Sequence, residues 1–481
     1  MLLKELVQKI DCQIIGDGNI NITGLQYDSR AVEPGDLFFC IKGFATDGHR
    51  FAPAAVEKGA VCLVVTERQE IDVPQVLVED DRAAMAEISA AFYGYPAKEL
   101  RMIGVTGTNG KTSITYLLKN ILEKEGSKVG LLGTIVNMIG DRPIHTERTT
   151  PESMDLQRLL RQMRDEGVDT VVMEVSSHSL VLKRVHGIPF AGAVFTNLTQ
   201  DHLDFHGTLE NYAAAKALLF QHSENSAINI DDAYGEYMAK AAAGSVVTYG
   251  AKGFGDVKAL NIDMTVEGSR FILQARGAKI PIVVRIPGMF SVYNALAAIT
   301  ISLQLGIDLI CIKQGIEAVE NVPGRFQRLD TRGGGYAMVL DYAHTPDSLE
   351  NALKTVREFA RGRVVCVFGC GGNRDNTKRP IMGEISGRLA DFTIVTSDNP
   401  RFEEPMAIID EIVPGVQRGG GKYVVIENRR EAIKYALEHA RKDDVILLAG
   451  KGHEDYQEIR GVKHPFDEKV VVSQLLDELG R

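Results

Sequence analysis

Short apolar runs alternate with polar and amphipathic stretches along the whole chain. Before residue 98 the runs are brief and rich in β-forming residues, as in DLFFCIKG and AVCLVV, with a turn at Pro34-Gly35 between them. Helical patterns follow at residues 54–58 and 82–93. This pattern predicts a small α/β domain over residues 1–98.

A second region begins after Pro96. The apolar run RMIGVTG leads into a glycine turn and a helical pattern over residues 113–125. TVVMEV and AGAVFTN continue as buried strands separated by helical or loop segments, which is the alternation typical of a parallel sheet. We predict a central domain with a mainly parallel sheet over residues 99–325.

A third alternation fills the rest of the chain. The strand-like runs are YAMVLDYA, RVVCVFG, DFTIVTSD, KYVVIE and DVILLAG, with helical patterns between them such as residues 429–442. This predicts a doubly wound, Rossmann-like domain over residues 326–481. Three domains suit 481 residues, because a single core rarely grows beyond about 300. The predicted fold class is therefore α/β in three domains.

Composition narrows the class of partner. The formal charge is -10, and acids and bases mix along the chain, so no basic field favours nucleic acid or an anionic membrane. No apolar run is as long as a membrane span, and the start, which carries Glu5 and Asp11, lacks the apolar core of a signal peptide. Six cysteines without a CxxC pair favour reduced thiols. We expect a cytoplasmic monomer that acts on a small or peptide-sized substrate.

The segment GTNGKT, residues 107–112, is the strongest chemical signal. A strand, a glycine turn and a helix aim backbone N–H groups at one point, which suits a polyphosphate. Lys111 would reach the outer phosphates and Thr112 would offer its hydroxyl to Mg²⁺. Five residues separate Gly104 from Gly110 where the usual loop has four, yet an ordinary turn would not explain Lys-Thr at the helix start. We predict an enzyme that uses ATP.

Two further strand ends carry polar groups. Glu174 ends TVVMEV, where it either holds a metal ion or faces solvent. His202 and His206 lie four residues apart after AGAVFTN, but no third soft ligand accompanies them, which disfavours zinc.

The helical pattern NYAAAKALLF contains a lysine among apolar residues. Spacing places Tyr212, Lys216 and Phe220 on one helix face. From the pattern alone, a solvated lysine is the commoner interpretation.

Together the motifs resemble a known family. GTNGKT, EVSSHSL, DHLDFHG, YAAAKALLF, MFSVYNALAA, PGRFQRLD and DYAHTPD, in this order, resemble the Mur ligases, ATP-dependent amide-forming enzymes of peptidoglycan synthesis. TTPES, GCGGNRD, SDNPR and GKGHEDYQ are similar to the members that add the third amino acid, meso-diaminopimelate. Lysine-adding members and folylpolyglutamate synthetase-like ligases share the loop and the chemistry and are the alternatives.

The resemblance implies that ATP phosphorylates a substrate carboxylate and that an amine then attacks the acyl phosphate. The implied catalytic residues are Lys111, Glu174, His202 and Lys216. The implied metal site for Mg²⁺ comprises Thr112, Glu174, His202 and Lys216 as its carbamate. The implied ATP-binding residues are Gly107, Thr108, Asn109, Gly110, Lys111, Thr112, Asn294, Arg325 and Asp341.

The resemblance also implies the substrate contacts. UDP-N-acetylmuramoyl-dipeptide is expected at residues 43–47 and at Ser29, Thr149, Thr150, Ser176 and Arg184. Relatives can carry glutamine where Leu182 stands, so one substrate hydrogen bond differs here. The residues implied for meso-diaminopimelate are Arg374, Asp398, Asn399, Pro400, Arg401, Gly450 and Glu454. They lie in loops that follow strands, so we expect them to converge on one edge of the sheet.

Overall fold

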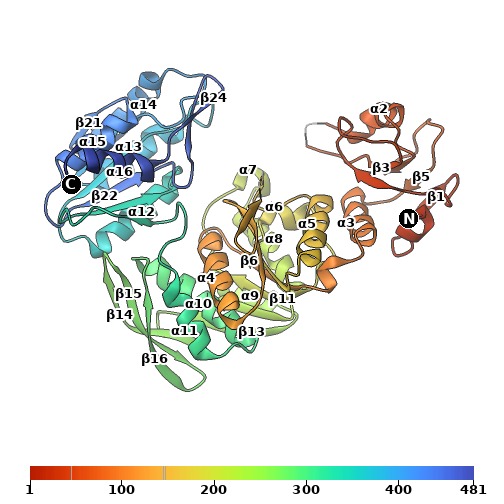
Figure 1. Ribbon diagram of the computed structural model, residues 1–481, viewed down its shortest axis with the longest axis horizontal. Helices are drawn as coiled ribbons and strands as arrows, with labels where there is room; N and C mark the ends of the chain where they lie inside the picture. The colour runs from red at the N-terminus through yellow and green to blue at the C-terminus, as the bar shows by residue number, and fades with distance from the viewer. Residues whose placement is uncertain (45, 145, 147) are drawn as a thin grey trace. The chain divides into compact units, whose positions relative to one another are not determined.

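The computed structural model describes residues 1–44, 46–144, 146 and 148–481. The chain divides into two compact units. Met1–Asp256 and Ala297–Gly315 form unit 1, and Val257–Leu296 and Ile316–Arg481 form unit 2. Both units are built from α/β layers, and the main sheets of both consist mostly of parallel strands (Figure 1), which confirms the predicted fold class.

The N-terminal part of unit 1 is a five-stranded sheet in the order β1-β5-β4-β3-β2. All its neighbours are parallel except β1, which pairs antiparallel with β5. Its core gathers Leu37, Phe39 and Val64 from the strands and Met85 from a helix. The elements are α1 (Leu3–Leu6), β1 (Gln13–Ile15), β2 (Gly24–Gln26), β3 (Asp36–Phe39), the 3-10 helix η1 (Gly48–Phe51), α2 (Ala52–Glu57), β4 (Cys62–Val65), β5 (Gln75–Leu77), α3 (Asp81–Phe92) and the 3-10 helix η2 (Pro96–Lys98).

The rest of unit 1 is built on a second sheet with β6 near its middle. β10 and β11 pair with β6 on opposite sides, both in parallel, so the carboxyl ends of the three strands share one edge. The elements are β6 (Arg101–Thr106), α4 (Lys111–Glu125), β7 (Val129–Leu132), β8 (Asn137–Ile139), β9 (Arg142–Ile144), α5 (Ser153–Asp165), β10 (Thr170–Glu174), α6 (Ser177–Val181), β11 (Phe190–Phe195), α7 (Leu203–His206), α8 (Leu209–Gln221), β12 (Asn225–Asn229), α9 (Gly235–Ala241) and β13 (Ser245–Gly250).

Unit 2 contains an antiparallel ribbon and a six-stranded sheet. The ribbon joins β14, β15 and β16, and the sheet runs β17-β18-β22-β19-β20-β21 with only β17 antiparallel. The elements are β14 (Val257–Thr265), β15 (Gly268–Ala275), β16 (Ala278–Val284), β17 (Gln327–Leu329), β18 (Ala337–Asp341), α12 (Pro346–Phe359), β19 (Val364–Phe368), α13 (Lys378–Leu389), β20 (Phe392–Val395), α14 (Pro405–Arg418), β21 (Tyr423–Val425), α15 (Arg429–Glu438), β22 (Val445–Ala449), β23 (Tyr456–Ile459), β24 (Val462–Pro465) and α16 (Glu468–Glu478). Two further helices, α10 (Met289–Gln304) and α11 (Leu309–Ala318), run through the boundaries between the units.

Helices cover both faces of the six-stranded sheet (Figure 1). Ala432 and Ile433 of α15 and Leu475 of α16 share one core cluster with alternate residues of the strands. Helices α12, α13 and α14 contact the same strands without contributing to that cluster. The predicted doubly wound arrangement is therefore present.

Element ends differ from the sequence prediction by a few residues. The helix predicted over residues 429–442 ends at Glu438, and the helix predicted from residue 113 begins at Lys111. Gly110 has φ 90° and caps α4, so the turn ends two residues earlier than the hydrophobic pattern indicates. All six cysteines are free thiols, as expected.

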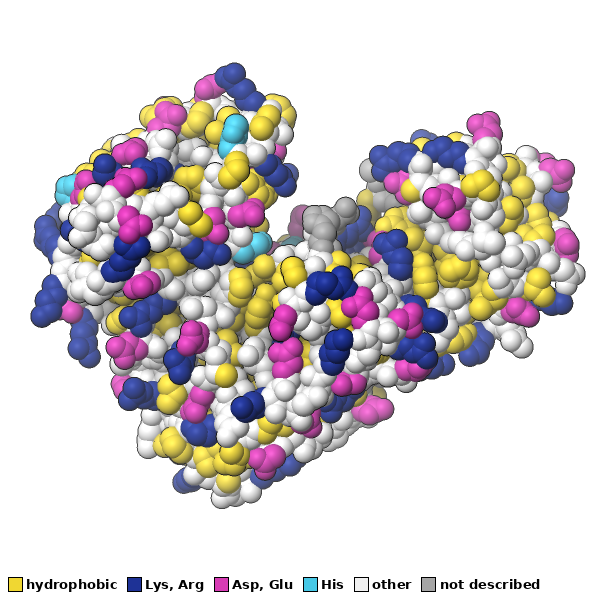
Figure 2. All heavy atoms as spheres, in the orientation of Figure 1, with side chains coloured by type: hydrophobic (Ala, Val, Ile, Leu, Met, Phe, Trp, Pro, Cys, Tyr) yellow, Lys and Arg dark blue, Asp and Glu magenta, His cyan; other side chains and the backbone are white. Residues whose placement is uncertain are grey.

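The surface has mixed charge. Lysine and arginine side chains are interspersed with aspartate and glutamate over the face drawn in Figure 2. Within the described residues, no helix has both the length and the apolar character needed to cross a membrane.

Glycines let α13 and α14 approach closely, and these two helices begin just after two of the predicted site loops. A Cβ added at Gly415 of α14 would lie 2.0 Å from the Pro380 carbonyl oxygen. A Cβ at Gly383 of α13 would lie 2.2 Å from the Ile412 carbonyl oxygen. Backbone atoms cannot yield as a flexible side chain can.

Gly415→Ala should therefore lower the free energy of unfolding. Alanine in a helix normally gains about 1 kcal/mol over glycine, but the clash should outweigh this gain and cost about 1–3 kcal/mol net. Urea unfolding checks the change, with Asp410→Ala on the exposed side of α14 as the control, expected within about 0.5 kcal/mol of wild type. A stabilised Gly415→Ala variant would contradict the packing argument.

Candidate functional site

The predicted phosphate-binding loop joins β6 to α4. Gly107 has φ 148°, and a Cβ there would lie 1.8 Å from Thr196 Oγ1, so only glycine fits. The loop is also held by the segment after β11: Thr108 N donates to the Asn197 carbonyl oxygen at 2.9 Å, and Asn109 N donates to Asn197 Oδ1 at 3.0 Å. Lys111 Nζ donates to the carbonyl oxygens of Gly107 and Thr108 at 2.9 and 2.8 Å. The ammonium group therefore lies against the loop at the N-terminus of a 15-residue helix.

Glu174 lies beside this loop because β10 is paired with β6. Its side chain is buried, with 1% of the residue exposed, so the interpretation as a solvent-facing acid is wrong. Thr112 Oγ1 donates to Glu174 Oε1 at 2.9 Å, while Thr134 donates to the carboxylate from its N at 3.0 Å and from Oγ1 at 2.9 Å. The start of α4 and the end of β10 thus present a hydroxyl and a carboxylate side by side.

Lys216 lies inside unit 1 rather than on its surface. Only 1% of the residue is exposed, so the solvated-lysine interpretation is wrong. Its Nζ is 4.4 Å from the ring centroid of Tyr212, and the Tyr212 hydroxyl is 3.3 Å from Thr108 Oγ1 in the loop. Burial, with a smaller contribution from the ammonium of Lys111, lowers the pKa of Lys216 well below 10.5. The packing around Lys216 therefore favours the neutral amine over the ammonium form.

The two histidines of DHLDFHG differ in environment. His202 has φ 53°, is about half exposed and lies 3.4 Å from Asp201 through Nε2 and Oδ2. His206 is buried with Nε2 2.9 Å from Ser177 Oγ. Burial, together with His178 and His202, lowers the pKa of His206 to about 4.

A different group of residues has the spacing of a metal site. Over the described part of the chain, it comprises Asp47, His49 and Glu67. Both ring nitrogens of His49 are already engaged, because Nδ1 lies 2.6 Å from Asp47 Oδ1 and Nε2 accepts from Thr66 N at 3.1 Å. His49 therefore has no lone pair to offer a metal ion.

Four of the five residues predicted for the UDP-substrate gather around the end of β10. Thr150 Oγ1 donates to the Glu174 carbonyl oxygen at 2.9 Å and accepts from Ser176 N at 3.2 Å. Thr149 Oγ1 lies 3.0 Å from Thr134 Oγ1, which itself contacts the Glu174 carboxylate. Arg184 Nη1 donates to the Thr150 carbonyl oxygen at 3.1 Å. The hydroxyls of Thr149 and Thr150 thus lie close to Glu174, whereas the Arg184 guanidinium bonds to the Thr150 backbone and pairs with Glu152 at 2.8 Å.

Ser29 lies apart from this group in the turn after β2 and is half-buried. In the loop expected at residues 43–47, Ala45 lies outside the described residues. Leu182 caps the C-terminus of α6, where its backbone N–H bonds to the carbonyl oxygens of that helix.

Unit 2 carries the other residues predicted for the nucleotide. Asn294 lies on α10 and is buried. Asp341 ends β18, and its Oδ2 accepts from Phe326 N at 2.8 Å. Burial raises the pKa of Asp341, and the positive charge of Arg325 acts against this rise. Arg325 lies 5.4 Å from the ring centroid of Tyr342, and its buried Nε has no hydrogen-bond partner among the described residues.

The loops predicted for the amino acid converge within unit 2, because they follow neighbouring parallel strands. Asn399 Nδ2 donates to Glu454 Oε2 at 2.8 Å, joining the loop after β20 to the loop after β22. Arg401 Nη1 donates to the Gly372 carbonyl oxygen at 3.0 Å in the loop after β19. A Cβ at Gly450 would lie 2.6 Å from Asp398 Oδ2, so the strand end approaches that carboxylate closely.

Arg374 and Pro400 lie in the same group of loops, where they pack close to Gly371 and Gly372. A Cβ added at Gly371 would lie 4.0 Å from Arg374 Cγ and 2.9 Å from Arg401 Nη1. A Cβ added at Gly372 would lie 2.0 Å from the Pro400 carbonyl oxygen. The structure therefore brings the predicted amino-acid residues to one edge of the sheet.

Sequence reasoning missed three residues of these sites. Thr134, in the loop after β7, makes two of the hydrogen bonds to Glu174. Lys451 and Arg429 are fully buried cations beside Asp398 and Glu454. The motif GKGHEDYQ contains Lys451 between the predicted Gly450 and Glu454, so its lysine was the available signal. Arg429 had no local signal, because a helix start with two arginines is typical of a solvated surface.

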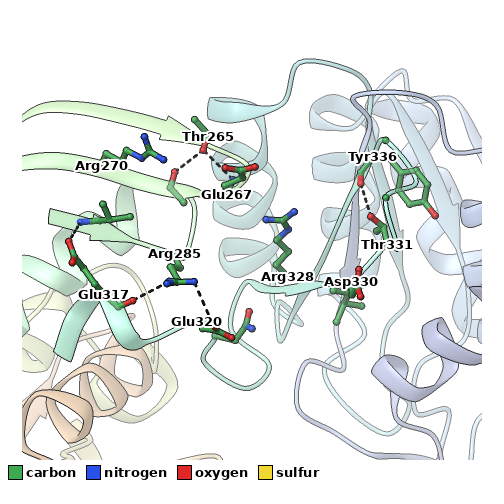
Figure 3. Close-up of a pocket in the computed structure, with 16 residues that line it drawn as sticks. Thr265, Glu267, Arg270, Arg285, Glu317, Glu320, Arg328, Asp330, Thr331 and Tyr336 are labelled. Atoms are coloured by element: carbon green, nitrogen blue, oxygen red, sulfur yellow. Dashed lines mark hydrogen bonds and ion pairs between the residues drawn. The ribbon is translucent and has the colours of Figure 1, made fainter. Parts of the chain in front are cut away.

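A cavity of about 940 Å³ lies elsewhere in unit 2, between the ribbon and β17 (Figure 3). Arg270, Arg285 and Arg328 on its walls are exposed, and Arg285 Nη1 is 3.5 Å from Glu320 Oε1. None of the predicted site residues lines it. Its arginines are balanced by acidic side chains, so it is an open groove of mixed charge, separate from the loops described above.

Family models match three parts of the chain. Residues 21–93 match "Mur ligase family, catalytic domain", residues 105–302 match "Mur ligase middle domain", and residues 324–452 match "Mur ligase, glutamate ligase domain".

Curated relatives and a solved structure match over the full length. The chain is 49% identical to the UDP-N-acetylmuramoyl-L-alanyl-D-glutamate–2,6-diaminopimelate ligase of Clostridium tetani, covering 100% of both chains. It is 52% identical to the protein of the same name from Caldanaerobacter subterraneus subsp. tengcongensis, covering 99% of both. A solved structure with that name aligns with a TM-score of 0.75 at 33% identity, covering 100% of this chain and 99% of the other. The chain therefore belongs to the Mur ligase family.

Proposed function

We propose that the protein joins 2,6-diaminopimelate, as its meso form, to the D-glutamate of UDP-N-acetylmuramoyl-L-alanyl-D-glutamate at the expense of ATP. The names of full-length relatives at 49% and 52% identity support this substrate pair. Within this proposal, residues 1–98 bind the uridine end, residues 99–325 bind ATP and residues 326–481 bind the amino acid. The protein acts as a monomer in the cytoplasm.

The proposed reaction has two steps. A carboxylate oxygen of the D-glutamate attacks the γ-phosphorus of ATP, which breaks the bond to the β-phosphate oxygen and releases ADP. An amine of diaminopimelate then attacks the acyl phosphate carbon, and the tetrahedral intermediate expels phosphate and loses a proton to give the amide. Both steps build negative charge on oxygen, so fixed cations and N–H donors aid them.

The phosphate-binding loop supplies such donors. The N–H groups at the start of α4 and the Lys111 ammonium face the same region as the positive end of the helix dipole. In unit 2, the Nε of Arg325, which has no hydrogen-bond partner among the residues that the structure describes, is a donor suited to a phosphate or ribose oxygen. This supports the proposal that Asn294, Arg325 and Asp341 bind the nucleotide.

The side chains at the end of β10 fit a Mg²⁺ ion. Thr112 and Glu174 offer a hydroxyl and a carboxylate oxygen 2.9 Å apart, and oxygen is the ligand that Mg²⁺ prefers. When bound, the ion neutralises phosphate charge. Thr134 holds the Glu174 carboxylate with two hydrogen bonds, and His202 and Lys216 are proposed to serve the same site.

The lowered pKa of Lys216 supports the proposed carbamate. A neutral lysine nitrogen can attack CO₂, which forms an N–C bond and releases one proton, and the product is an anion. That anion would be attracted by the Lys111 ammonium, which disfavours a second cation at this position, and it converts a buried amine into a group suited to a cation.

The observation that carries the proposal is the Thr112–Glu174 hydrogen bond, which joins the start of the phosphate-binding helix to a buried carboxylate. We expect phosphate release from ATP only when the UDP-muramoyl-dipeptide and diaminopimelate are both present. A coupled assay that omits each substrate in turn measures this requirement. ATP hydrolysis that is indifferent to both would contradict the proposed function.

Lys216→Met should lower kcat by about 100-fold, because it removes the proposed anion. In wild type, stripping CO₂ from the buffer should reduce activity and bicarbonate should restore it, whereas the variant should not respond. Lys240→Met, on an exposed lysine of α9, is the control and should behave as wild type. Bicarbonate-independent, fully active Lys216→Met would contradict the carbamate.

The Lys216→Met variant should also differ from wild type in how its free energy of unfolding depends on pH. The unfolded chain binds a proton at Lys216 that the folded protein lacks between the lowered pKa and 10.5. The free energy of unfolding of wild type should therefore rise with pH relative to Lys216→Met across that range. Urea unfolding as a function of pH, without CO₂, measures the difference.

Arg401 is the proposed selector of diaminopimelate over lysine. Glu458 Oε2 accepts from its Nε at 3.1 Å and keeps the guanidinium in place at the edge of the pocket. Arg401→Lys should lower kcat/KM for diaminopimelate by about 10–100-fold, because a charge-assisted hydrogen bond contributes about 1.5–3 kcal/mol. Lysine turnover should remain low in wild type. Equal wild-type kcat/KM for lysine and diaminopimelate would mean that the protein is the lysine-adding alternative.

A further inference from the structure

Two buried cations lie beneath the loops that hold Asp398 and Glu454. Lys451 and Arg429 each have a side chain with 0% exposed surface. Lys451 lies within the motif GKGHEDYQ but was not among the residues predicted for the amino acid, and Arg429 lies outside the motifs. Lysine and arginine are almost never fully buried unless they are paired. Their partners therefore indicate what the two cations do.

Lys451 follows β22 and is bonded to the two loops that meet there. Its Nζ donates to Asn399 Oδ1 at 3.0 Å and to Glu454 Oε2 at 3.2 Å. Glu458 N also donates to Asn399 Oδ1, at 3.0 Å. Two donors on Oδ1 fix the orientation of the amide, so that Nδ2 donates to Glu454 Oε2 at 2.8 Å. Lys451 thus sets the position of both Asn399 and Glu454.

Arg429 is the first residue of α15, and its side chain approaches the Asp398 carboxylate. Its Nε donates to Glu468 Oε1 at 2.8 Å and its Nη2 to the Ala449 carbonyl oxygen at 2.9 Å. Its Nη1 is buried without a hydrogen-bond partner among the described residues and lies 3.9 Å from Asp398 Oδ2. Glu468 and the end of β22 therefore hold a guanidinium against Asp398.

Asp398 is left with an incomplete set of partners. Lys451 Nζ is 4.0 Å from its Oδ1 and Arg429 Nη1 is 3.9 Å from its Oδ2, both beyond hydrogen-bond distance. The hydrogen bond described for this carboxylate comes from Asn399 N, at 2.7 Å to Oδ1. Asp398, Glu454 and Glu468 carry three negative charges and Lys451 and Arg429 two positive charges, so one negative charge is uncompensated.

We propose that Lys451 and Arg429 are positioning residues that hold Asp398, Asn399 and Glu454 as a preformed acceptor for an ammonium group of the amino-acid substrate. This inference rests on the proposed function for the identity of that substrate. The two cations offset the negative charge of the neighbouring carboxylates at close range, and the surplus negative charge is the one an ammonium would neutralise. Without either cation, the carboxylates repel each other and their geometry is lost.

The test is a set of KM values for all three substrates. Lys451→Met should raise the KM for the amino acid at least about tenfold, while the KM for ATP and for the UDP-muramoyl-dipeptide change little. Lys463→Met is the matched control, because Lys463 is exposed and contacts Tyr456, the same ring that Lys451 approaches. Lys451→Arg keeps the charge and should recover most of the amino-acid affinity.

The pH profile separates positioning from simple loss of structure. Asp398 and Glu454 must be ionised to bind an ammonium, and loss of a neighbouring cation raises carboxyl pKa values. The acid limb of kcat/KM for the amino acid should therefore move to higher pH in Lys451→Met and stay in place in Lys463→Met. A variant that had only lost structure would keep the position of that limb.

Variants of Arg429 provide an independent test of the same proposal. Arg429→Met should raise the amino-acid KM in the same way, and Arg429→Lys should restore part of it, whereas Arg430→Met, on the neighbouring arginine that pairs with Glu478 at the surface, should not. Thermal unfolding and the KM for ATP report the folded state of each variant.

The outcomes are distinguishable from those of the proposed function. Wild type is first assayed with diaminopimelate and with lysine. The KM for whichever amino acid wild type uses is then compared between wild type and the variants. Wild type inactive with diaminopimelate contradicts the proposed substrate. An active wild type whose Lys451→Met and Arg429→Met variants keep the amino-acid KM, or raise all three KM values equally, overturns the positioning role.

Discussion

The parallel pairing of β6 with β10 and β11 is the constraint on which the site of unit 1 depends. Parallel strands end on the same edge, so the loop after β6, Glu174 at the end of β10 and Thr196 after β11 are brought together. The hydrogen bond from Thr112 to Glu174 and the contacts of Thr196 and Asn197 with the loop follow from that register. A shift of one residue would turn each side chain to the other face.

The same rule organises unit 2, with different chemistry at the strand ends. β18, β22, β19 and β20 are consecutive neighbours, so their four following loops share an edge. In unit 1, the edge of the sheet presents backbone donors, hydroxyls and one buried carboxylate. In unit 2, the corresponding edge presents a network of charged side chains, in which the cations lie below the loops and the carboxylates lie within them. One architectural principle thus underlies both the proposed phosphate site and the proposed amino-acid site.

Burial changes the chemical character of groups that look ordinary in the sequence. Lys216 is a lysine in an alanine-rich helix, yet burial in the core around α8 lowers the pKa of its amine well below the usual value. Lys451 lies in a glycine-containing loop, yet it is completely buried and donates hydrogen bonds to two residues, Asn399 and Glu454. In both cases, the surrounding packing determines protonation or pairing, which local spacing does not encode.

The sequence by itself determined the alternation of strands and helices, the phosphate-binding loop and the motifs of the four C-terminal loops. These are local features: a hydrophobic period, a glycine that alone tolerates φ 148°, and short runs of polar residues after strands. Only the tertiary structure decided that Glu174 and Lys216 are buried, that Thr134 holds Glu174, and that Arg429 lies against Asp398. Those facts depend on which strands become neighbours and which side chains the core encloses. Residues far apart in the chain make these contacts, so no window of sequence contains them.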